Sequence, residues 1–332
     1  MLARTREMKV VGLGLKDGEV RLAPSVPQWK RAYSTEAYQI FDWLRLESLR
    51  LYFIGSASVP GLVAKPVLDI LGCVYSLAEL DAVSHRLEGL GYESLGEYGI
   101  PGRRYFRLRS EDGIDYVHLH LFEESDPKWT EHLRFRDSLL KDEELRGKYA
   151  TAKVQAAEVA QNRDDYQQRK AQVIKEILAK AIPEARKAVA VLGAAEGHGN
   201  TLAYLQEAYD GWDLKIHDLN SVRVEPYSYR ERRQDDFFRI IDDALAADRL
   251  VIATPVYWYA MSGAMKDFLD RFSDLMGGPG KTRGEALFGK KVEILVSGYD
   301  HKLPFGFEVP VAATCLYFAM DYLGARYRAN RH

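Results

Sequence analysis

A glycine-spaced turn at residues 191–205, VLGAAEGHGNTLAYL, is the first stretch of this sequence whose residue types could do chemistry. An apolar run leads into the turn and a helix pattern follows it, so backbone N–H groups of residues 194–201 would gather at a helix N-terminus. Such N–H groups, with the hydroxyl of Thr201, suit the binding of a phosphate. Asn200 and Thr201 also cap the first turn of a helix without any ligand, so this structural explanation stays open.

Three kinds of phosphate site share this glycine spacing. A P-loop is excluded, because Gly199 is followed by Asn200 and no lysine is present to reach the outer phosphates. A dinucleotide turn is compatible with Gly197, Gly199 and the acid at Asp218. The position of its third glycine is occupied by Leu202, however, which weakens that interpretation. The third kind is a cradle for a single phosphate.

A second chemically informative stretch, TPVYWYAMSGAMKDFLDR, covers residues 254–271. It follows the apolar strand pattern RLVIA and contains three consecutive aromatic residues, Tyr257, Trp258 and Tyr259. In open parallel sheets, ligands bind beyond the carboxyl ends of the strands. Aromatic side chains exposed at that place indicate packing on something flat, either a planar ring or a partner chain. The loop therefore favours the single-phosphate cradle of a ring-bearing ligand over the dinucleotide turn.

The elements that position these two stretches can be read from the order of the apolar patterns. From Ala188 onward, apolar strands alternate with amphipathic helices, which predicts a parallel sheet covered by helices on both faces. Before them, residues 144–182 predict one long polar helix that Pro183 ends. The change of pattern predicts two domains, residues 1–183 and 187–332, as expected for a chain of 332 residues.

The glycine turn and the aromatic loop together resemble the flavodoxin-like NAD(P)H-dependent oxidoreductases of the FMN reductase superfamily, over residues 187–330. The resemblance implies an α/β, doubly wound parallel sheet of order 2-1-3-4-5. It also implies FMN as cofactor, NADPH or NADH as hydride donor, and a flavin or quinone-like small molecule as electron acceptor. Tyr257 and His301 would lie closest to the flavin ring and are the candidate catalytic residues. The implied flavin-binding residues are Ala194, Glu196, His198, Gly199, Asn200, Thr201, Pro255, Val256, Tyr257, Trp258, Tyr259, Ser297, Gly298 and Tyr299.

Two features of this second domain depart from the family pattern. Ala194 stands where relatives usually carry a serine that holds the FMN phosphate. The sequence reaches His332 directly after the fifth predicted strand, so we expect the usual last helix to be absent. A sheet face left bare in this way would be covered by the first domain or by a second copy of the chain, and we expect a homodimer.

The first domain contains its own phosphate-binding pattern, YFIGSASVPGLVAKPVLDI, at residues 52–70. Gly55 and Ser56 end one apolar strand, and Asp69 lies in the next. Backbone N–H groups of such a turn can surround a triphosphate while the carboxylate holds Mg²⁺. A tight turn with a capped carboxylate explains the same residues without a ligand, so both interpretations stay open.

This pattern, with VRLAPSVPQWKRAY, GIPGRRYF and DYVHLHLFEESDPKWTEHLRF, resembles the GrpB family over residues 9–180. The resemblance implies an α+β, nucleotidyltransferase-like fold with a mixed sheet. His118 and His120 alternate on one strand and face the same side, where they could contact a phosphate or a metal together with Asp69. The second acid of a nucleotidyltransferase is missing, since Leu71 occupies its place. The candidate nucleotide-binding residues are Gly55, Ser56, Lys65, Asp69, Arg103, Arg104, His118 and His120, with Asp69 as the magnesium ligand.

Composition limits the partners of the chain. It carries 46 Lys and Arg against 48 Asp and Glu, and each half is close to neutral, which argues against a nucleic-acid partner. No stretch approaches 18 consecutive apolar residues and the N-terminus has no signal-peptide core, so we expect a cytoplasmic protein that does not bind membranes. Cys73 and Cys315 lie in apolar surroundings, which predicts two buried thiols rather than a disulfide.

These observations predict an FMN-dependent NAD(P)H oxidoreductase fused to a GrpB-like nucleotide-binding domain. One alternative is a nucleotidyltransferase or nucleotide-binding protein whose flavodoxin-like half serves only for dimerisation or binding. Another is a sensor that binds both ligands without catalysis.

Overall fold

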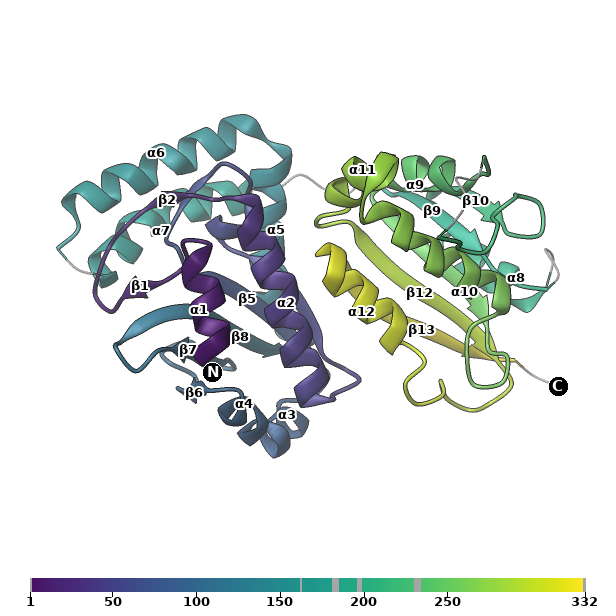
Figure 1. Cartoon of the computed structure of the whole chain (residues 1–332), viewed down its shortest axis with the longest axis horizontal. Coiled ribbons are helices and arrows are strands. Elements are labelled where there is room, and N and C mark those ends of the chain that lie inside the picture. The colour runs from purple at the N-terminus through teal and green to yellow at the C-terminus, as the bar shows by residue number, and fades with distance from the viewer. Residues whose placement is uncertain (1, 162, 181–184, 196–198, 230–233, 331–332) are drawn as a thin grey trace. The chain divides into compact units, whose positions relative to one another are not determined.

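A computed structural model describes residues 2–161, 163–180, 185–195, 199–229 and 234–330 of the chain. The chain divides into two compact units, Met1–Pro183 and Glu184–His332, which we call the first and second units (Figure 1). Within the described residues, no helix combines the length and the apolar composition needed to cross a membrane. Cys73 and Cys315 are both buried free thiols, as predicted.

The first unit is built on a mixed sheet of order β3-β5-β8-β7-β6, with β1 paired to β8. β5 and β8 run parallel, and the other neighbours are antiparallel. This confirms the mixed sheet expected from the GrpB resemblance. The strands are β1 Leu15–Lys16, β3 Arg50–Ile54, β5 Leu68–Val74, β6 Tyr92–Ser94, β7 Arg104–Arg109 and β8 Ile114–Glu123, and a separate small sheet pairs β2 Ala23–Pro24 with β4 Val63–Ala64.

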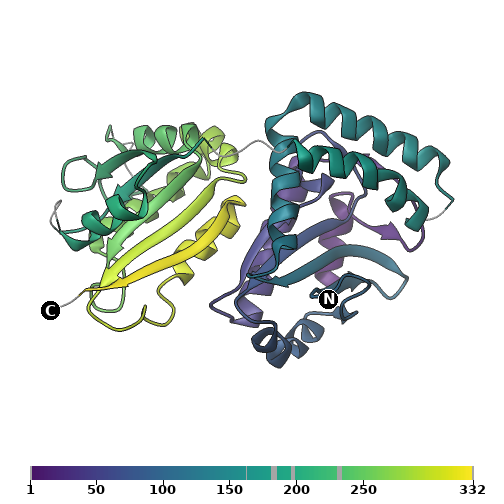
Figure 2. The same ribbon diagram turned by 180° about the vertical axis from the view of Figure 1, so that it is seen from behind.

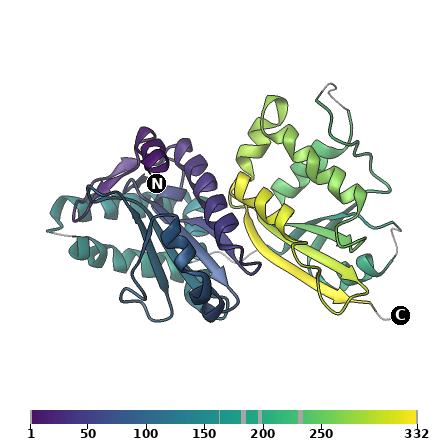
Figure 3. The same cartoon turned by 60° about the horizontal axis from the view of Figure 1, so that its bottom comes forward.

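Helices cover both faces of this sheet. Tyr33 of α2 stacks on Phe53 of β3, whereas Trp129 of α5 stacks on the neighbouring Tyr52. Because adjacent residues of a strand point to opposite faces, α2 and α5 lie on opposite sides of the sheet. Helix α1 lies beside α2 (Figure 3). The helices are α1 Leu2–Val10, α2 Pro27–Leu44, η1 Ser56–Ser58, α3 Leu77–Val83, α4 His85–Gly89, α5 Pro127–Lys141, α6 Glu143–Val159 and α7 Arg163–Ala179.

The last two helices of the first unit, α6 and α7, lie side by side (Figure 2). The prediction of one long helix over residues 144–182 is therefore wrong. Helix α6 ends at Val159, because the next residue, Ala160, has an extended backbone. Asp165, in the first turn of α7, accepts the N–H of Gln161 through its carboxylate. The two helices share a core with α5 and the loop after η1, formed by Val59, Leu62, Leu139, Leu145, Tyr149, Val173 and Ile177.

The second unit is a five-stranded parallel sheet of order β10-β9-β11-β12-β13 (Figure 2). In chain order this is 2-1-3-4-5, so the predicted flavodoxin-like topology is confirmed. It places the carboxyl ends of β9, β11 and β12 next to one another. The strands are β9 Lys187–Leu192, β10 Asp213–Asp218, β11 Arg249–Pro255, β12 Lys291–Gly298 and β13 Asp321–Ala329.

Each face of this second sheet has its own apolar core. On one face, Leu205 of α8 and Tyr209 directly after it pack with Val251 and Ala253 of β11. Over the other face, Phe272 makes edge contacts with the aromatic rings of Phe237, Phe268 and Phe318. Strand β13 is the last element that the structure describes. The helical segments are α8 Asn200–Ala208, α9 Phe237–Ala246, α10 Gly263–Asp270, η2 Arg271–Leu275, η3 Gly278–Gly280, α11 Lys281–Ala286 and α12 Val309–Phe318.

Candidate functional site

The predicted phosphate loop of the second unit follows β9. A Cβ atom on Gly193 would lie 2.9 Å from Met265 Cβ and 2.9 Å from Ser262 Oγ, so glycine is needed for α10 to approach this strand end. The Ala194 carbonyl accepts a hydrogen bond from Asn220 Nδ2 at 2.7 Å. Glu196 and His198, two of the predicted cofactor-binding residues, lie outside the described residues. The part of the loop that is described is thus held by α10 and by the segment after β10.

Helix α8 and strand β12 bring together two further predicted residues. Thr201 is buried in the first turn of α8, and its Oγ1 lies 2.8 Å from Ser297 Oγ at the end of β12. Of the two residues before Thr201, Gly199 is half-buried and Asn200 is exposed. The Thr201–Ser297 hydrogen bond fixes both hydroxyl groups beside the helix N-terminus, where N–H groups are free to bind an anion.

The aromatic loop after β11 forms a tight two-residue reversal. Tyr257 N–H donates to the Ala260 carbonyl at 2.8 Å, and Ala260 N–H donates back to Tyr257 at 3.1 Å. The two residues between them, Trp258 and Tyr259, have φ angles of 49° and 66°. Their side chains are 93% and 72% exposed. A reversal of this kind usually carries Asn-Gly, because a left-handed backbone costs an L residue about 1–2 kcal/mol.

The base of this loop is rigid. The buried Thr254 Oγ1 accepts the N–H of Ser262 at 3.1 Å, and Ser262 Oγ accepts the N–H of Met265 at 3.2 Å. Pro255 pairs in register with Ser297, and Val256 N–H donates to the Ser297 carbonyl at 2.8 Å. The strained aromatic turn therefore stands on a fixed support beside the end of β12.

The loop after β12 contains the remaining predicted residues. A Cβ atom on Gly298 would lie 2.7 Å from the Tyr327 hydroxyl, which itself donates to the Asp300 carbonyl at 2.7 Å. Tyr299 and His301 are exposed. Phe305, further along the loop, is almost fully exposed and was not predicted from the sequence. Exposed aromatic side chains thus come from the loops after β11 and β12, which are neighbouring strands.

These three loops fit an FMN molecule on the evidence of the chain itself. A helix N-terminus with two fixed hydroxyl groups suits the phosphate, and aromatic side chains exposed on a rigid support suit a planar ring. Asp218, the acid of the alternative dinucleotide site, accepts both the backbone N–H and the side-chain amide of Asn220. It therefore holds the segment that supports Ala194.

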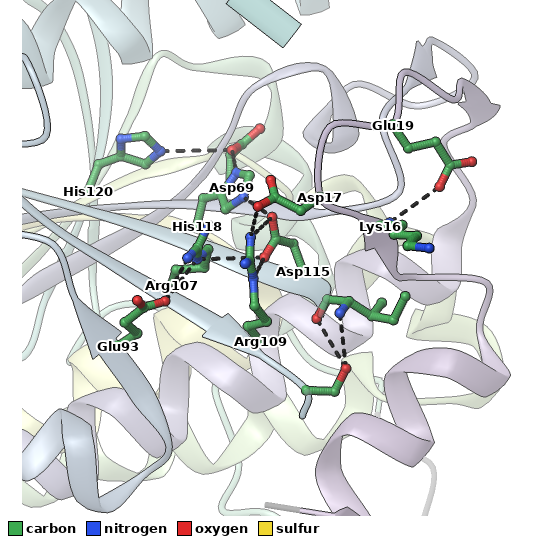
Figure 4. Close-up of polar contacts among 12 residues, drawn as sticks. Lys16, Asp17, Glu19, Asp69, Glu93, Arg107, Arg109, Asp115, His118 and His120 are labelled. Carbon is green, nitrogen blue, oxygen red and sulfur yellow. Dashed lines mark hydrogen bonds and ion pairs between the residues drawn. The ribbon is translucent and has the colours of Figure 1, made fainter. Parts of the chain in front are cut away.

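In the first unit, the predicted acid and the two histidines meet on one face of the sheet (Figure 4). Asp69 of β5 lies in register with His118 of β8. His118 Nδ1 is 3.3 Å from Asp69 Oδ1, and His120 Nε2 is 3.8 Å from the same oxygen. Burial raises the pKa of Asp69, but the hydrogen bonds with the two histidines outweigh it and hold this pKa far below its usual range. Asp69 is therefore an ionised acceptor.

Arg103 joins this cluster from the loop before β7. Its Nη1 lies 3.1 Å from His120 Nδ1, and its guanidinium also donates to the carbonyls of Glu97 and Tyr98. Because arginine only donates, His120 Nδ1 accepts, which leaves the proton of a neutral His120 on Nε2, facing Asp69. Burial lowers the pKa of His120, in agreement with a neutral ring.

A second carboxylate lies on the other side of His118. Asp115 Oδ2 is 3.7 Å from His118 Nε2, and Asp115 Oδ1 accepts from Arg109 Nε at 2.6 Å. Arg107 and Arg109 extend the network to Glu93 and Asp17 at 2.7 Å and 3.0 Å (Figure 4). A continuous chain of alternating charge therefore runs across β5, β8 and β7.

Two predictions for this cluster need correction. Arg104 points away from it, because its Nε and Nη2 both donate to the carboxylate of Asp81 at 2.8 Å. The magnesium site at Asp69 is not supported, since the described residues contain no group of three His, Cys, Asp or Glu side chains able to hold a metal ion. The groups nearest to Asp69 are nitrogen donors rather than a second carboxylate.

Comparison with known proteins finds a family-model match in each unit. Residues 19–180 match the family model described as GrpB protein, and residues 186–303 match the model described as NADPH-dependent FMN reductase. The Glutamate-rich protein GrpB of Alkalihalophilus pseudofirmus is 31% identical over 170 residues, which are 50% of this chain and 98% of that protein. The chain belongs to the GrpB family. The match to the FMN reductase model lies in the second unit of the same chain.

Two relatives from Bacillus subtilis show the extent of the similarity. YqkA is 32% identical over 141 residues, which are 42% of this chain and 40% of that protein. YwqN, provisionally named an NAD(P)H-dependent FMN-containing oxidoreductase, is 31% identical over 100 residues, which are 28% of this chain and 55% of that protein. The chain thus spans less than two thirds of the length of each of these two relatives.

One member of the cluster in the first unit, Asp115, was not identified from the sequence. Asp115 and His118 are three residues apart, so strict alternation along β8 places them on opposite faces. The pairing of β7 with β8 shifts between Leu108 and Arg109, where an extra residue of β8 is inserted. This bulge places Asp115 on the same face of the sheet as His118. No residue near the bulge in the sequence indicates where it lies.

Proposed function

We propose that the second unit is an NAD(P)H-dependent FMN oxidoreductase that passes electrons to a small, flat organic acceptor. The observation that carries the proposal is the turn at Trp258 and Tyr259, where two exposed aromatic residues are kept in a strained backbone on a rigid support. Strain of this kind concentrates at ligand sites, where binding depends on the unusual geometry. The FMN reductase family match over residues 186–303 supports the same assignment.

The residues of the three loops would divide the work of holding FMN. The N-terminus of α8 and the Thr201 hydroxyl would bind the phosphate, with Ser297 orienting that hydroxyl. Pro255 to Tyr259 and the exposed Tyr299 would lie against the ring. Bound FMN supplies the exchange of hydride between a nicotinamide and an acceptor. The chain contributes position, backbone donors and exclusion of water, and Tyr257 and His301 are the side chains proposed nearest to the ring.

We propose in addition that two copies of the chain associate through this edge of the second unit. Trp258 and Phe305 are almost fully exposed, and large aromatic side chains in solvent are typical of surfaces that bind another molecule. A second copy would shield a bound ring from water. Sedimentation of the full chain with and without FMN tests this, and a monomer under both conditions contradicts it.

The oxidoreductase proposal is tested on the purified full chain. FMN is titrated under anaerobic conditions while flavin fluorescence is followed, and NADPH or NADH is then added. We expect saturable quenching by the protein and bleaching of the flavin absorbance by one of the two nicotinamides. Riboflavin, which lacks the phosphate, serves as the matched ligand and should bind more weakly. Absence of saturable FMN binding would overturn the proposal.

A further inference from the structure

The carbonyl of Ala194, at the start of the predicted phosphate loop, is held by a side chain that follows a different strand. Asn220 Nδ2 donates to this carbonyl at 2.7 Å and to Asp218 Oδ1 at 3.0 Å. An amide nitrogen has two N–H donors, and these two acceptors use both of them. Asn220 is exposed, so hydrogen bonds rather than burial define the position of its amide.

The backbone after β10 does not make this contact itself. Leu219 N–H donates to the Leu192 carbonyl at 2.9 Å, at the end of the ladder between β9 and β10. The next ladder hydrogen bond would join the N–H of Ser221 to the Ala194 carbonyl, because every second residue of a strand faces the same neighbour. Ser221 N–H instead donates to the Asp218 carbonyl at 2.8 Å, in a turn. A side chain therefore supplies the hydrogen bond that would continue the ladder.

Holding this carbonyl also fixes the direction of the next N–H group. Within the described residues no peptide bond is cis, so the Ala194 carbonyl and the Ala195 N–H point in opposite directions. The carbonyl points towards β10, and the N–H therefore points towards β11, which lies on the other side of β9. The N–H of Gly193 points the same way, since it donates to the Ala253 carbonyl of β11 at 2.8 Å.

The Ala195 N–H group is open to a ligand on that side. The pairing of β9 with β11 ends at Leu192 and Ala253, before this group is reached. The structure shows no hydrogen bond from the Ala195 N–H to a described residue, and Ala195 is exposed. The group points over the ends of β9 and β11, towards the side on which β12 carries Ser297. A backbone N–H in this position can donate to an anion.

The opposite orientation of the same peptide would have the reverse effect on a phosphate. If the Ala194 carbonyl turned towards β11, its oxygen would face the ligand in place of an N–H donor. Oxygen atoms of a carbonyl and of a phosphate are both acceptors and repel each other. Ala194 has no hydroxyl of its own to offer, so the direction of this peptide decides what residues 194 and 195 contribute to binding.

We infer that Asn220 is a positioning residue for the phosphate of FMN. Its side-chain amide keeps the Ala194–Ala195 peptide with the N–H towards the ligand, and Asp218 keeps the amide in place. This role rests on the proposed function of the second unit, because it belongs to the same flavin site. It adds the segment after β10 to the three loops of that site, and it gives a preference for phosphorylated flavin a physical origin.

The affinities of the full chain for FMN and for riboflavin, measured by fluorescence titration, test this role. Asn220→Ala removes the donor to the Ala194 carbonyl and should weaken FMN binding by about tenfold, as loss of one hydrogen bond to a charged group does. Riboflavin has no phosphate, so its affinity should not change. The ratio of the two affinities should therefore fall by the same factor as the FMN affinity.

Asn220→Asp sharpens the test because it keeps the size of the side chain. A carboxylate cannot donate a hydrogen bond, so it repels the Ala194 carbonyl and Asp218 instead of binding them. We expect a larger loss of FMN affinity than in Asn220→Ala, with riboflavin affinity again unchanged. Ser221→Asp places the same added charge on the exposed neighbouring residue without removing the amide. It is the matched control and should lower FMN affinity much less.

The possible results separate this role from the function proposed for the second unit. If the wild type binds neither flavin, the proposed function fails and the role of Asn220 fails with it. If the wild type prefers FMN and both Asn220 variants keep the wild-type ratio, only the role of Asn220 is wrong. Equal weakening of FMN and riboflavin would also contradict it, because the loss would then not involve the phosphate. Equal losses of FMN affinity in Ser221→Asp and Asn220→Asp would contradict it as well, since charge alone would explain them.

Discussion

In the first unit the candidate residues lie on the neighbouring strands β5 and β8 and are enclosed by ion pairs, whereas in the second unit they lie on loops and several project into solvent. Hydrogen bonds to His118 help to keep the pKa values of both Asp69 and Asp115 low. Trp258 and Tyr259 make no such network, and their geometry is held by backbone strain on a rigid base. The first arrangement is sensitive to the loss of any charged member, and the second tolerates substitution of its exposed members.

The largest effect should come from breaking the network of the first unit at Asp115. This carboxylate is buried and binds Arg109, so Asp115→Ala removes the buried partner of that cation and leaves it the exposed Asp17. We expect a loss of about 3–5 kcal/mol in the free energy of unfolding, measured by urea denaturation. Asp81→Ala removes the partner of Arg104 in a solvent-exposed pair and should cost less than about 1 kcal/mol. Equal losses of unfolding free energy in the two variants would show that the buried network stabilises the fold no more than an exposed ion pair does.

The second prediction concerns the pH dependence of the first unit. Burial, with a smaller contribution from the charge of Arg103, lowers the pKa of His132 to about 4, from an ordinary value near 6.5. Between these values the unfolded chain binds more protons at this position than the folded chain does. The folded state therefore loses stability as the pH falls from about 6.5 towards 4, with a slope of up to about 1.4 kcal/mol per pH unit for this one group.

Denaturation of wild type and His132→Gln at pH 7 and pH 5 measures this slope. The substitution should reduce the loss of stability at pH 5, because glutamine does not titrate. His217 of the second unit, whose pKa burial also lowers, contributes to both proteins and cancels in the difference. Identical slopes in the two proteins would show that His132 does not contribute to the pH dependence.

The comparison also shows which parts of the molecule the sequence can predict. The parallel sheet of the second unit was predicted correctly from the alternation of strands and helices, whereas its strand order was implied by the family resemblance. The meeting of Asp69, His118 and His120 followed from strand alternation. Asp115 was missed because a bulge breaks that alternation. Local patterns thus predict regular elements well and irregularities poorly.

The burial of two lysines shows a different limit. Lys153 and Lys170 lie on helices whose composition is typical of a solvated surface, yet both side chains are buried. The division at Ala160 folds α7 back beside α6, and only this tertiary arrangement buries both lysines. Sequence periodicity describes one helix at a time, so it contains no information on which faces of two polar helices meet.

A third prediction addresses the strained turn of the second unit. Trp258→Gly relieves the left-handed backbone, and we expect the free energy of unfolding to rise by about 1 kcal/mol or less, since glycine also adds freedom to the unfolded chain. The same change should weaken FMN binding, because a ring proposed to face the flavin is lost. Trp258→Phe keeps both the strain and a ring and should leave stability and affinity close to wild type. A destabilised Trp258→Gly would show that the exposed side chain stabilises the fold instead.

The smallest expected effect concerns Ala194, the position at which the resemblance to the FMN reductase superfamily implies a phosphate-binding serine. This residue is half-buried, and its carbonyl is held by Asn220, so the backbone position is fixed before any ligand binds. Ala194→Ser should add one hydroxyl donor and tighten FMN binding by about two- to fivefold, the equivalent of about 0.5–1 kcal/mol. Riboflavin affinity should not change, because riboflavin has no phosphate. Equal tightening of both ligands would mean that residue 194 acts on the ring, and unchanged FMN affinity would place the phosphate away from the β9 loop.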